Sequence, residues 1–353
     1  MHFPSGLLLF LAAAAPAAKA PTAAAPDAGQ APALPRPMAS ALAPLPASER
    51  VDWSHSPFEA ADCSLCHKGR DPKKPGPLVK DTNELCLDCH EDFAEILKRK
   101  TPHPPAQDAC THCHNPHNSR QKHLLRADVT TLCGECHADL VKAARAAKVG
   151  HSPVTTGPAC ASCHDPHGSS LPKLLDRPAF ELCLGCHTRE LTDSSGKKLP
   201  SFKRLLDDNP KWHGPVAAKN CLACHQPHGS DDLRLLAADY PAKFYAPFDA
   251  KAYELCFKCH DSALAQAAQT TTATRFRDGS RNLHFVHVNR PDLGRTCRAC
   301  HDAHAAQQDH LLRGSVPYGT SGWVLKLNYA PGPNGGSCEK TCHNTRSYDR
   351  QKK

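Results

Sequence analysis

The stretch that decides the fold reads CASCHDPHGS and runs from Cys160 to Ser169. It holds two cysteines three positions apart, a histidine directly after the second, and another histidine three residues further on. Two thiols at this spacing can add to the two vinyl groups of one haem, and the histidine that follows then lies under the iron. The stretch therefore predicts covalent attachment of a c-type haem.

The Cys-x-x-Cys-His pattern recurs along the chain, and we number its copies as sites 1 to 10 in chain order. The tenth copy is longer by one residue, with three residues between Cys338 and Cys342, and the ten copies use all 20 cysteines. The predicted thioether cysteines are Cys63, Cys66, Cys86, Cys89, Cys110, Cys113, Cys133, Cys136, Cys160, Cys163, Cys183, Cys186, Cys221, Cys224, Cys256, Cys259, Cys297, Cys300, Cys338 and Cys342. The predicted proximal iron ligands are His67, His90, His114, His137, His164, His187, His225, His260, His301 and His343.

Zinc is the main alternative, because Cys-x-x-Cys pairs also form zinc sites. A zinc site places no demand on the residue after the second cysteine, and neither does a disulfide framework. A histidine at that position in all ten copies therefore favours ten c-type haems. No thiol remains for a disulfide or a nucleophile.

The ten sites form five tandem modules of two sites each. The first cysteines of the two sites are 23 residues apart in modules one to three, and 35 and 41 residues apart in modules four and five. A fixed interval that repeats indicates a duplicated structural unit. The modules cover about residues 51–95, 96–145, 146–195, 205–268 and 280–348.

The second axial ligand of each iron is expected to be histidine. The only methionines, Met1 and Met38, precede the sites, which excludes His/Met ligation within the cytochrome region. Nine of the predicted distal ligands follow a pattern. Five leading histidines precede the first site of a module, and four plus-three histidines lie three residues after a first proximal histidine. The leading histidines are His55, His103, His151, His213 and His287, and the plus-three histidines are His117, His167, His228 and His304.

His284 completes the distal set. Module one lacks a plus-three histidine, whereas module five has an additional histidine before its first site. His123 and His310 align with Lys173 and Arg234 in other modules, and His112 lies inside a Cys-x-x-Cys loop, so we interpret these three as bystanders. A plus-three histidine can hardly reach the opposite face of its own haem. We therefore expect the plus-three histidines to ligate a neighbouring haem and to join the modules into one stack.

Composition indicates that the haems replace an ordinary protein core. Aromatic residues make up only 6% of the chain, which has 32 prolines and 24 histidines. We expect mostly irregular loops with short helices at residues 91–100, 138–148 and 261–269, almost no strand, and no folding without haem. The net charge of +8 does not indicate nucleic-acid binding. Ten haems would add about twenty propionate charges, and the chain has no basic run with interleaved aromatic residues.

The N-terminal region predicts export. Residues 1–20 contain a short apolar run, Leu7 to Ala18, followed by small residues, which is typical of a signal peptide and too short to span a membrane. Residues 21–50 are rich in Ala and Pro and are expected to form a disordered linker to a cytochrome domain at 51–353. No cysteine for lipidation precedes Cys63, and no later stretch approaches 18 apolar residues.

The segments CHNPHNS, CHDPHGS and CHQPHGS, each preceded by a leading histidine and followed by LCxxCH, resemble the doubled-CxxCH family of multihaem c-type cytochromes. The number of sites and the size of the chain look like those of decahaem subunits of porin–cytochrome conduits. That resemblance implies a periplasmic or outer-membrane location, redox protein partners, a β-barrel porin and an extracellular multihaem cytochrome. The long tenth site and the missing plus-three histidine of module one depart from the pattern.

Electron transfer is the predicted function, because irons with two histidine ligands have no open position for substrate. Two alternatives remain. One is a reductase of nitrite, hydroxylamine or a sulfur oxyanion, which would need one iron without a distal ligand. The other is a subunit of an extracellular cytochrome filament.

Overall fold

A computed structural model describes residues 42–46, 49–193, 196–291, 293–318, 323–339 and 342–353. The chain divides into two units, Met1–Arg36 and Pro37–Lys353. The first unit, the predicted signal peptide and most of the predicted linker lie outside the described residues, so every helix and strand named below belongs to the second unit. Within the described ranges, no helix is long and apolar enough to cross a membrane.

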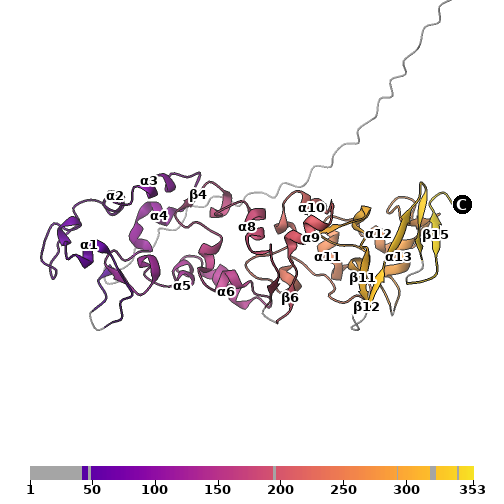
Figure 1. Cartoon of the computed structure of the whole chain (residues 1–353), viewed down its shortest axis with the longest axis horizontal. Coiled ribbons are helices and arrows are strands. Elements are labelled where there is room, and N and C mark those ends of the chain that lie inside the picture. Colours follow the sequence, from indigo (N-terminus) through magenta and orange to yellow (C-terminus); the bar gives the residue numbers. More distant parts are fainter. Residues whose placement is uncertain (1–41, 47–48, 194–195, 292, 319–322, 340–341) are drawn as a thin grey trace, which may run out of the picture. The chain divides into compact units, whose positions relative to one another are not determined.

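Short helices and 3-10 turns alternate with loops, and in Figure 1 they follow one another in sequence order through the second unit. The α-helices are α1 (Ser56–Glu59), α2 (Thr82–Leu87), α3 (Asp92–Ile96), α4 (Pro104–Asp108), α5 (Val129–Gly134), α6 (Ala138–Ala146), α7 (Ser152–Thr155), α8 (Ala179–Cys186), α9 (Phe202–Asp208), α10 (Gly214–Ala217), α11 (Glu254–Phe257), α12 (Ala263–Gln266) and α13 (Leu283–Val288). The three helices predicted from sequence are confirmed as α3, α6 and α12, each shorter than its predicted range. The predicted fold class, loops with short helices, is confirmed as well.

The first site of every module has the same backbone. Its first cysteine lies in a 3-10 turn and its second cysteine directly follows that turn: η2 (Cys63–Leu65), η3 (Cys110–His112), η5 (Ala159–Ser162), η7 (Cys221–Ala223) or η10 (Cys297–Ala299). The amide of the proximal histidine donates to the carbonyl of the first cysteine, at 3.1 Å for His164 and Cys160. The proximal histidine also forms an isolated bridge with a leucine eleven residues later, as His164 does with Leu175. The chain thus returns to the proximal histidine in each module.

The second sites of modules one to four begin instead on the α-helices α2, α5, α8 and α11, each of which ends within the motif. The remaining 3-10 turns are η4 (Lys122–Leu124), η6 (Pro172–Leu174), η8 (Leu233–Leu235), η9 (Lys251–Tyr253) and η11 (Asp309–Leu311).

Two-residue strands connect each module to the next. β1 (Trp53–Ser54) pairs with β3 (Asn118–Ser119), β2 (Thr101–Pro102) with β4 (Gly168–Ser169), and β7 (Lys211–Trp212) with β10 (Ala305–Ala306). The bridge between Val149 and Ser230 takes the same place between modules three and four. Each pairing joins the residues before a leading histidine to the residues after the plus-three histidine of the next module.

Gly168 shows how closely the modules approach. Its φ is +150°, and a Cβ at this position would lie 2.7 Å from the carbonyl oxygen of Ile96 in the preceding module. Only glycine combines this backbone conformation with this contact.

Module five ends in a β region that the sequence did not indicate. β11 (Ser315–Tyr318) pairs with β12 (Trp323–Lys326), and β13 (Asn328–Pro331), β14 (Gly335–Glu339) and β15 (Arg346–Asp349) form a three-stranded antiparallel sheet. Two further hairpins pair β5 (Leu191–Thr192) with β6 (Lys198–Leu199), and β8 (Arg277–Asp278) with β9 (Arg281–Asn282). Site 10 therefore begins on a strand, β14, and not on a helix.

The side chains of the described residues form only a small hydrophobic core. Its described hydrophobic cluster consists of Phe180, Leu206 and Ala305, with partly buried side chains around them. Among the described residues, the largest fully buried side chains are Tyr253, Val316 and Asn282. A chain of this length would normally bury many more large apolar side chains. The small core therefore agrees with the expectation that haems fill the interior.

Candidate haem sites

Histidine rings face each other in pairs along the second unit. Seven proximal histidines lie opposite a predicted distal histidine, with ring centroids 6.1–6.3 Å apart and ring planes within 9–29° of parallel. The pairs are His67–His117, His90–His55, His114–His167, His164–His228, His225–His304, His260–His213 and His301–His284.

This separation is that of two imidazoles on one metal ion. Two metal–nitrogen bonds of about 2 Å, each extended by about 1.1 Å from the nitrogen to its ring centre, place two axial ring centres about 6.2 Å apart. Directly stacked rings would lie closer, because aromatic contacts begin at about 4.5 Å between centroids. The gap between the paired rings therefore fits an iron ion between them.

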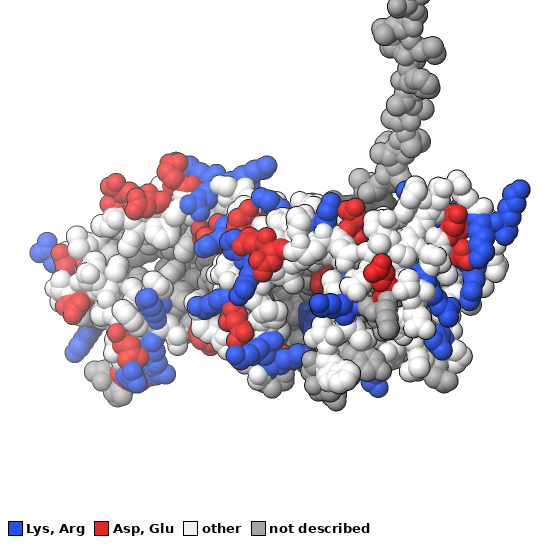
Figure 2. Space-filling model, turned by 45° about the vertical axis from the view of Figure 1, so that its right-hand side comes forward, with Lys and Arg blue, Asp and Glu red and all other residues white. Residues whose placement is uncertain are grey.

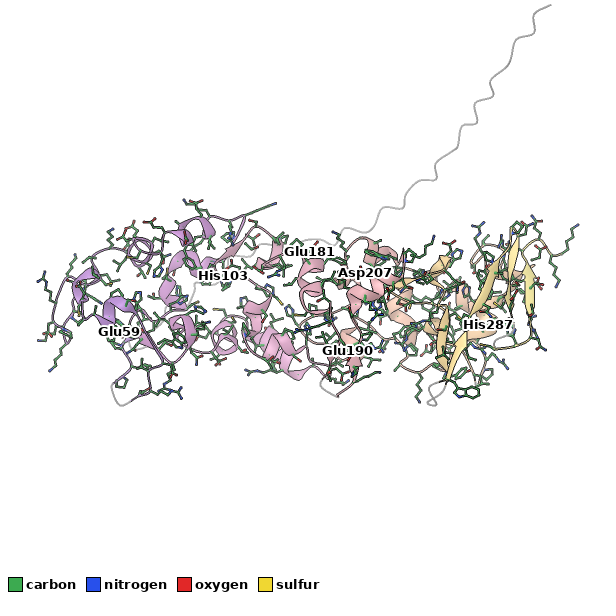
Figure 3. The ribbon with its side chains drawn as sticks, in the orientation of Figure 1. Glu59, His103, Glu181, Glu190, Asp207 and His287 are labelled. Carbon is green, nitrogen blue, oxygen red and sulfur yellow. The ribbon has the colours of Figure 1, made fainter. Side chains whose placement is uncertain are left out.

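The other three proximal histidines have a predicted distal histidine as an electrostatic neighbour. Burial lowers the pKa of His103, and the ring of His137 lowers it further. The same holds for His187, whose pKa is lowered by burial and then by His151. The pKa of His287 is lowered by burial and, among other groups, by His343. Figure 3 labels His103 in module two and His287 in module five, at widely separated places in the unit.

The ten pairs follow one rule. His55 and His213 face the second proximal histidine of their own module, and the other three leading histidines have that histidine as an electrostatic neighbour. Each plus-three histidine faces the first proximal histidine of the preceding module. His167 of module three, for example, faces His114 of module two. Module one, the first of the five modules, has Arg70 at the plus-three position. In module five, the last of the five, His301 faces His284 of the same module. The missing plus-three histidine and the additional leading histidine thus lie in the first and the last module of the row of ten sites.

The Nδ1 atoms of most paired rings are already hydrogen-bonded. The leading histidines His55, His103, His151 and His213 donate from Nδ1 to the carbonyl oxygens of Pro116, Pro166, Pro227 and Ala303 in the next module, at 2.7–3.0 Å. His287 donates to Leu283 O at 2.7 Å. A hydrogen bond at Nδ1 fixes the tautomer and leaves Nε2 free to bind a metal.

Sequence reasoning missed the groups that orient the first proximal histidine of each module. Nδ1 of His67, His114, His164, His225 and His301 donates to the carbonyl of the residue nine positions later, which is Gly76, His123, Lys173, Arg234 or His310, at 2.7–3.1 Å. All five acceptor residues have a left-handed backbone with φ between 55° and 76°. Because the acceptor is a main-chain oxygen, the side chain there varies, and only the constant offset of nine residues could have revealed it.

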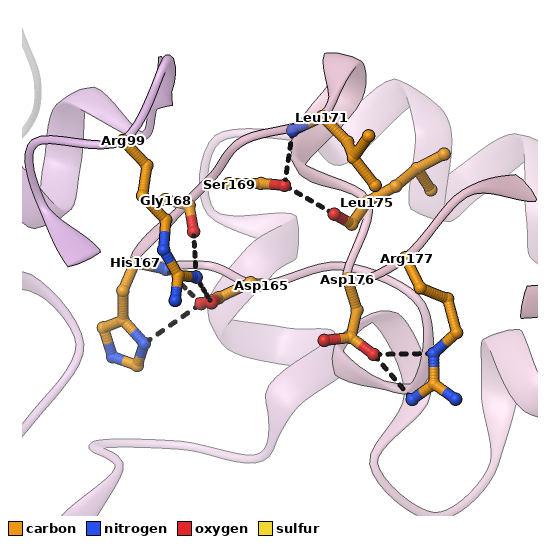
Figure 4. A network of polar contacts seen from close by, with 9 residues as sticks. All are labelled: Arg99, Asp165, His167, Gly168, Ser169, Leu171, Leu175, Asp176 and Arg177. Atoms are coloured by element: carbon orange, nitrogen blue, oxygen red, sulfur yellow. Dashed lines mark hydrogen bonds and ion pairs between the residues drawn. The ribbon is translucent and has the colours of Figure 1, made fainter.

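The plus-three histidines have more varied partners. In module three, the backbone N–H of His167 donates to Asp165 Oδ1 at 3.0 Å, and the His167 Nδ1 atom lies 3.4 Å from the same oxygen (Figure 4). Arg99 of module two donates to Asp165 Oδ2 at 2.9 Å and to Gly168 O at 3.2 Å. This network couples the ring that faces His114 to the module that contains His114.

A short segment before module one holds the plus-three histidine of module two. His117 Nδ1 donates to Leu42 O at 2.9 Å, Asn115 Nδ2 donates to Ala43 O at 3.1 Å, and the Leu45 amide donates to Asn118 Oδ1 at 2.8 Å. The described end of the predicted linker is therefore ordered against module two.

The three histidines interpreted as bystanders have other surroundings. His112 is buried and its Nε2 atom lies 2.6 Å from Asp108 Oδ2. His123 and His310 are exposed, and their main-chain carbonyls accept the Nδ1 hydrogen bonds of His114 and His301.

Comparison with known proteins agrees with this arrangement. A family model described as "Doubled CXXCH motif" matches residues 55–95, 103–142, 151–192 and 213–265, which are modules one to four from each leading histidine onward. The chain belongs to the doubled CXXCH family of multihaem c-type cytochromes. No curated protein matches its sequence.

The residues of the cytochrome fit haem c in three respects. The paired rings leave room for an iron, the Nδ1 hydrogen bonds leave Nε2 available, and each pair of thiols lies next to its proximal histidine. Burial also favours the neutral form that binds metals at two distal rings, since it lowers the pKa of His284 and of His304 to about 4.

The cysteines of consecutive sites are neighbours in an alternating order. Between modules, the first cysteine of a second site is a neighbour of the first cysteine of the next site, in the pairs Cys86–Cys110, Cys133–Cys160, Cys183–Cys221 and Cys256–Cys297. Within modules, the second cysteines of the two sites are electrostatic neighbours, in the pairs Cys66–Cys89, Cys113–Cys136, Cys163–Cys186, Cys224–Cys259 and Cys300–Cys342. Consecutive sites are therefore adjacent in space from site 1 to site 10.

Proposed function

We propose that this cytochrome holds ten c-type haems, each between two histidines, and conducts electrons from one end of the row to the other. The observation that carries the proposal is the set of facing histidine pairs, seven of them at 6.1–6.3 Å. Haem iron between two imidazoles supplies reversible one-electron chemistry between the ferric and ferrous states.

The protein residues position and protect that chemistry. The paired histidines would hold each iron from both sides, which would leave no iron open to substrate. Hydrogen bonds from Nδ1 to carbonyls keep the ring orientations fixed and increase the basicity of the ligands, which favours the ferric state. The neighbouring cysteines of consecutive sites support a single continuous route, because each haem would be anchored beside the next.

We further propose that the cytochrome works outside the cytoplasm, between periplasmic donors and an outer-membrane or extracellular acceptor. Covalent haem attachment in bacteria takes place after export, and the apolar run near the N-terminus is typical of a signal peptide. The size and the ten sites of the chain support a role beside a β-barrel porin and an extracellular multihaem cytochrome, as in porin–cytochrome conduits.

Intact-mass measurement combined with a reductive titration tests the proposal. The purified protein should carry ten haems and take up ten electrons per chain, and a Cys63→Ala/Cys66→Ala variant should carry nine and take up nine. Fewer than ten haems in the unaltered chain would contradict the proposal. Turnover of nitrite or hydroxylamine at a rate proportional to the enzyme concentration would favour a reductase instead.

A further inference from the structure

The two ends of the row carry opposite charge. Residues 51–95 contain five Lys and Arg against ten Asp and Glu, a net charge of −5. Residues 270–353 contain thirteen Lys and Arg against six Asp and Glu, a net charge of +7. Two oxidised haems add a net charge of about −2 to each end, from propionates less the ferric charge, so the difference in sign persists. Figure 2 shows Lys and Arg side chains gathered at the end that contains the C-terminal strands.

Three arginines form the part of this basic end that lies beside site 10. Arg281 lies on β9 and Arg346 on β15, and Arg275 shortly precedes β8; all three side chains are exposed. β8 pairs with β9 and contacts β15, so the three arginines lie on adjoining elements. We call them the terminal arginines.

The terminal arginines are available for an outside partner. In the described part of the chain, no carboxylate forms an ion pair with any of them. Asp278 lies opposite Arg281 in the β8–β9 ladder, but its ion pair is with Lys352 at 2.8 Å. Exposed arginines without an ion-pair partner act at long range on an approaching molecule.

Site 10 adjoins one of the terminal arginines directly and the others through Phe276. Arg346 is the register partner of Cys338, the first thioether cysteine of site 10, in the β14–β15 ladder. Phe276, next to Arg275, contacts Tyr348 of β15 at 5.1 Å and the rings of His284 and His287 at 5.2 and 5.7 Å between centroids. A partner bound at the terminal arginines would therefore sit close to the last two sites of the row.

We propose that the terminal arginines form the docking surface for an acidic redox protein, which exchanges single electrons with the row at site 10. In the inward direction, one electron leaves the reduced partner and one ferric iron becomes ferrous, with no bond made or broken. This inference rests on the proposed electron-transfer function and adds to it which end meets an acidic partner. The acidic module one disfavours the same partner at site 1, so the charge distribution selects one end.

The test uses the full holo-cytochrome and a reduced acidic plant-type [2Fe–2S] ferredoxin, whose potential of about −400 mV suits it as a donor. The variant Arg275→Glu/Arg281→Glu/Arg346→Glu reverses the three charges. Its matched control is Lys68→Glu/Arg70→Glu/Lys73→Glu, which makes the same change at exposed positions of module one. Stopped-flow absorbance gives the second-order rate of haem reduction across a series of salt concentrations.

We expect the arginine variant to react at least tenfold more slowly than the unaltered protein at low salt, because steering by complementary charge raises association rates by about 10 to 1,000-fold. The difference should vanish as salt screens the charges. The control variant should keep the original rate. Calorimetric titration with oxidised ferredoxin supplies a readout independent of electron transfer, and its Kd should rise in the arginine variant alone.

Two results would overturn the inference by itself. One is equal rates and Kd values for the arginine variant and the unaltered protein. The other is a control variant whose reduction rate falls as much as that of the arginine variant. Reduction by dithionite tests the proposed electron-transfer function separately from the docking surface. If dithionite fails to deliver ten electrons to the unaltered protein, the proposed function falls and the docking surface with it.

Discussion

His284 is the distal histidine outside the regular pattern, and its removal gives a quantitative prediction. Its ring lies 6.3 Å from that of His301, and Nδ1 lies 2.9 Å from Thr274 Oγ1. Substitution of His284 by Ala should leave one axial position open at site 9 alone. Since the row would hold ten irons, about one tenth of them should become reactive towards a small ligand.

Carbon monoxide measures this directly, because ferrous haem binds it at an open or weakly held axial position. The reduced His284→Ala variant should bind one CO per chain, and the unaltered protein should bind none. Added imidazole should compete with CO by filling the vacated position. The control is His310→Asn, which removes an imidazole from module five, keeps the acceptor carbonyl, and suits the left-handed backbone at φ 55°.

Two results would refute the reasoning. If His284→Ala binds no CO, another group must hold the iron of site 9, or that site carries no haem. If His310→Asn binds CO to the same extent, the separation of ligands from bystanders by internal alignment is wrong.

The remaining predictions concern the modules and the cofactor. Excision of residues 103–150 should bring His167 opposite His67 and leave an eight-haem protein that binds no CO, as spectroscopy of the purified variant would show; one bound CO per chain would contradict the pairing rule. Gly168→Ala should destabilise the contact between modules two and three by about 1–3 kcal/mol and lower the Tm, because its Cβ meets a carbonyl, whereas Gly150→Ala, with no heavy atom within 4 Å, should not. The chain made without haem should be degraded rapidly in limited proteolysis, because it has little core of its own; a protease-resistant haem-free form would count against that account.

Local spacing made the attachment sites predictable. Two cysteines and a histidine within five or six residues define each site, so the ten sites can be read without knowing the fold. Internal alignment then separated His284 from His123, because only one of them occurs where other modules carry Lys or Arg. The structure places each predicted distal histidine next to one proximal histidine, while iron ligation itself stays a prediction.

The hydrogen-bond acceptors of the histidines, the pairing of modules and the C-terminal sheet depend on backbone geometry, which leaves little trace in the sequence. The acceptor for His164 Nδ1 is the carbonyl of Lys173, and a main-chain oxygen places no constraint on the side chain. Which module a leading histidine approaches depends on two-residue strands such as β2 and β4, which are too short to produce an alternating pattern. The sheet around Cys338 was missed for a related reason, since its strands of four or five residues are interrupted by Gly and Pro.

The most direct test of the central claim is an electron paramagnetic resonance spectrum of the fully oxidised protein, quantified against total haem. If every iron lies between two histidines, all ten ferric haems should be low-spin, with allowance for pairs whose signals are broadened by magnetic coupling, and no high-spin signal should be present. A high-spin signal that accounts for about one tenth of the haem would contradict the claim. It would show an iron without its second ligand, and the protein would then have a site at which a substrate could bind.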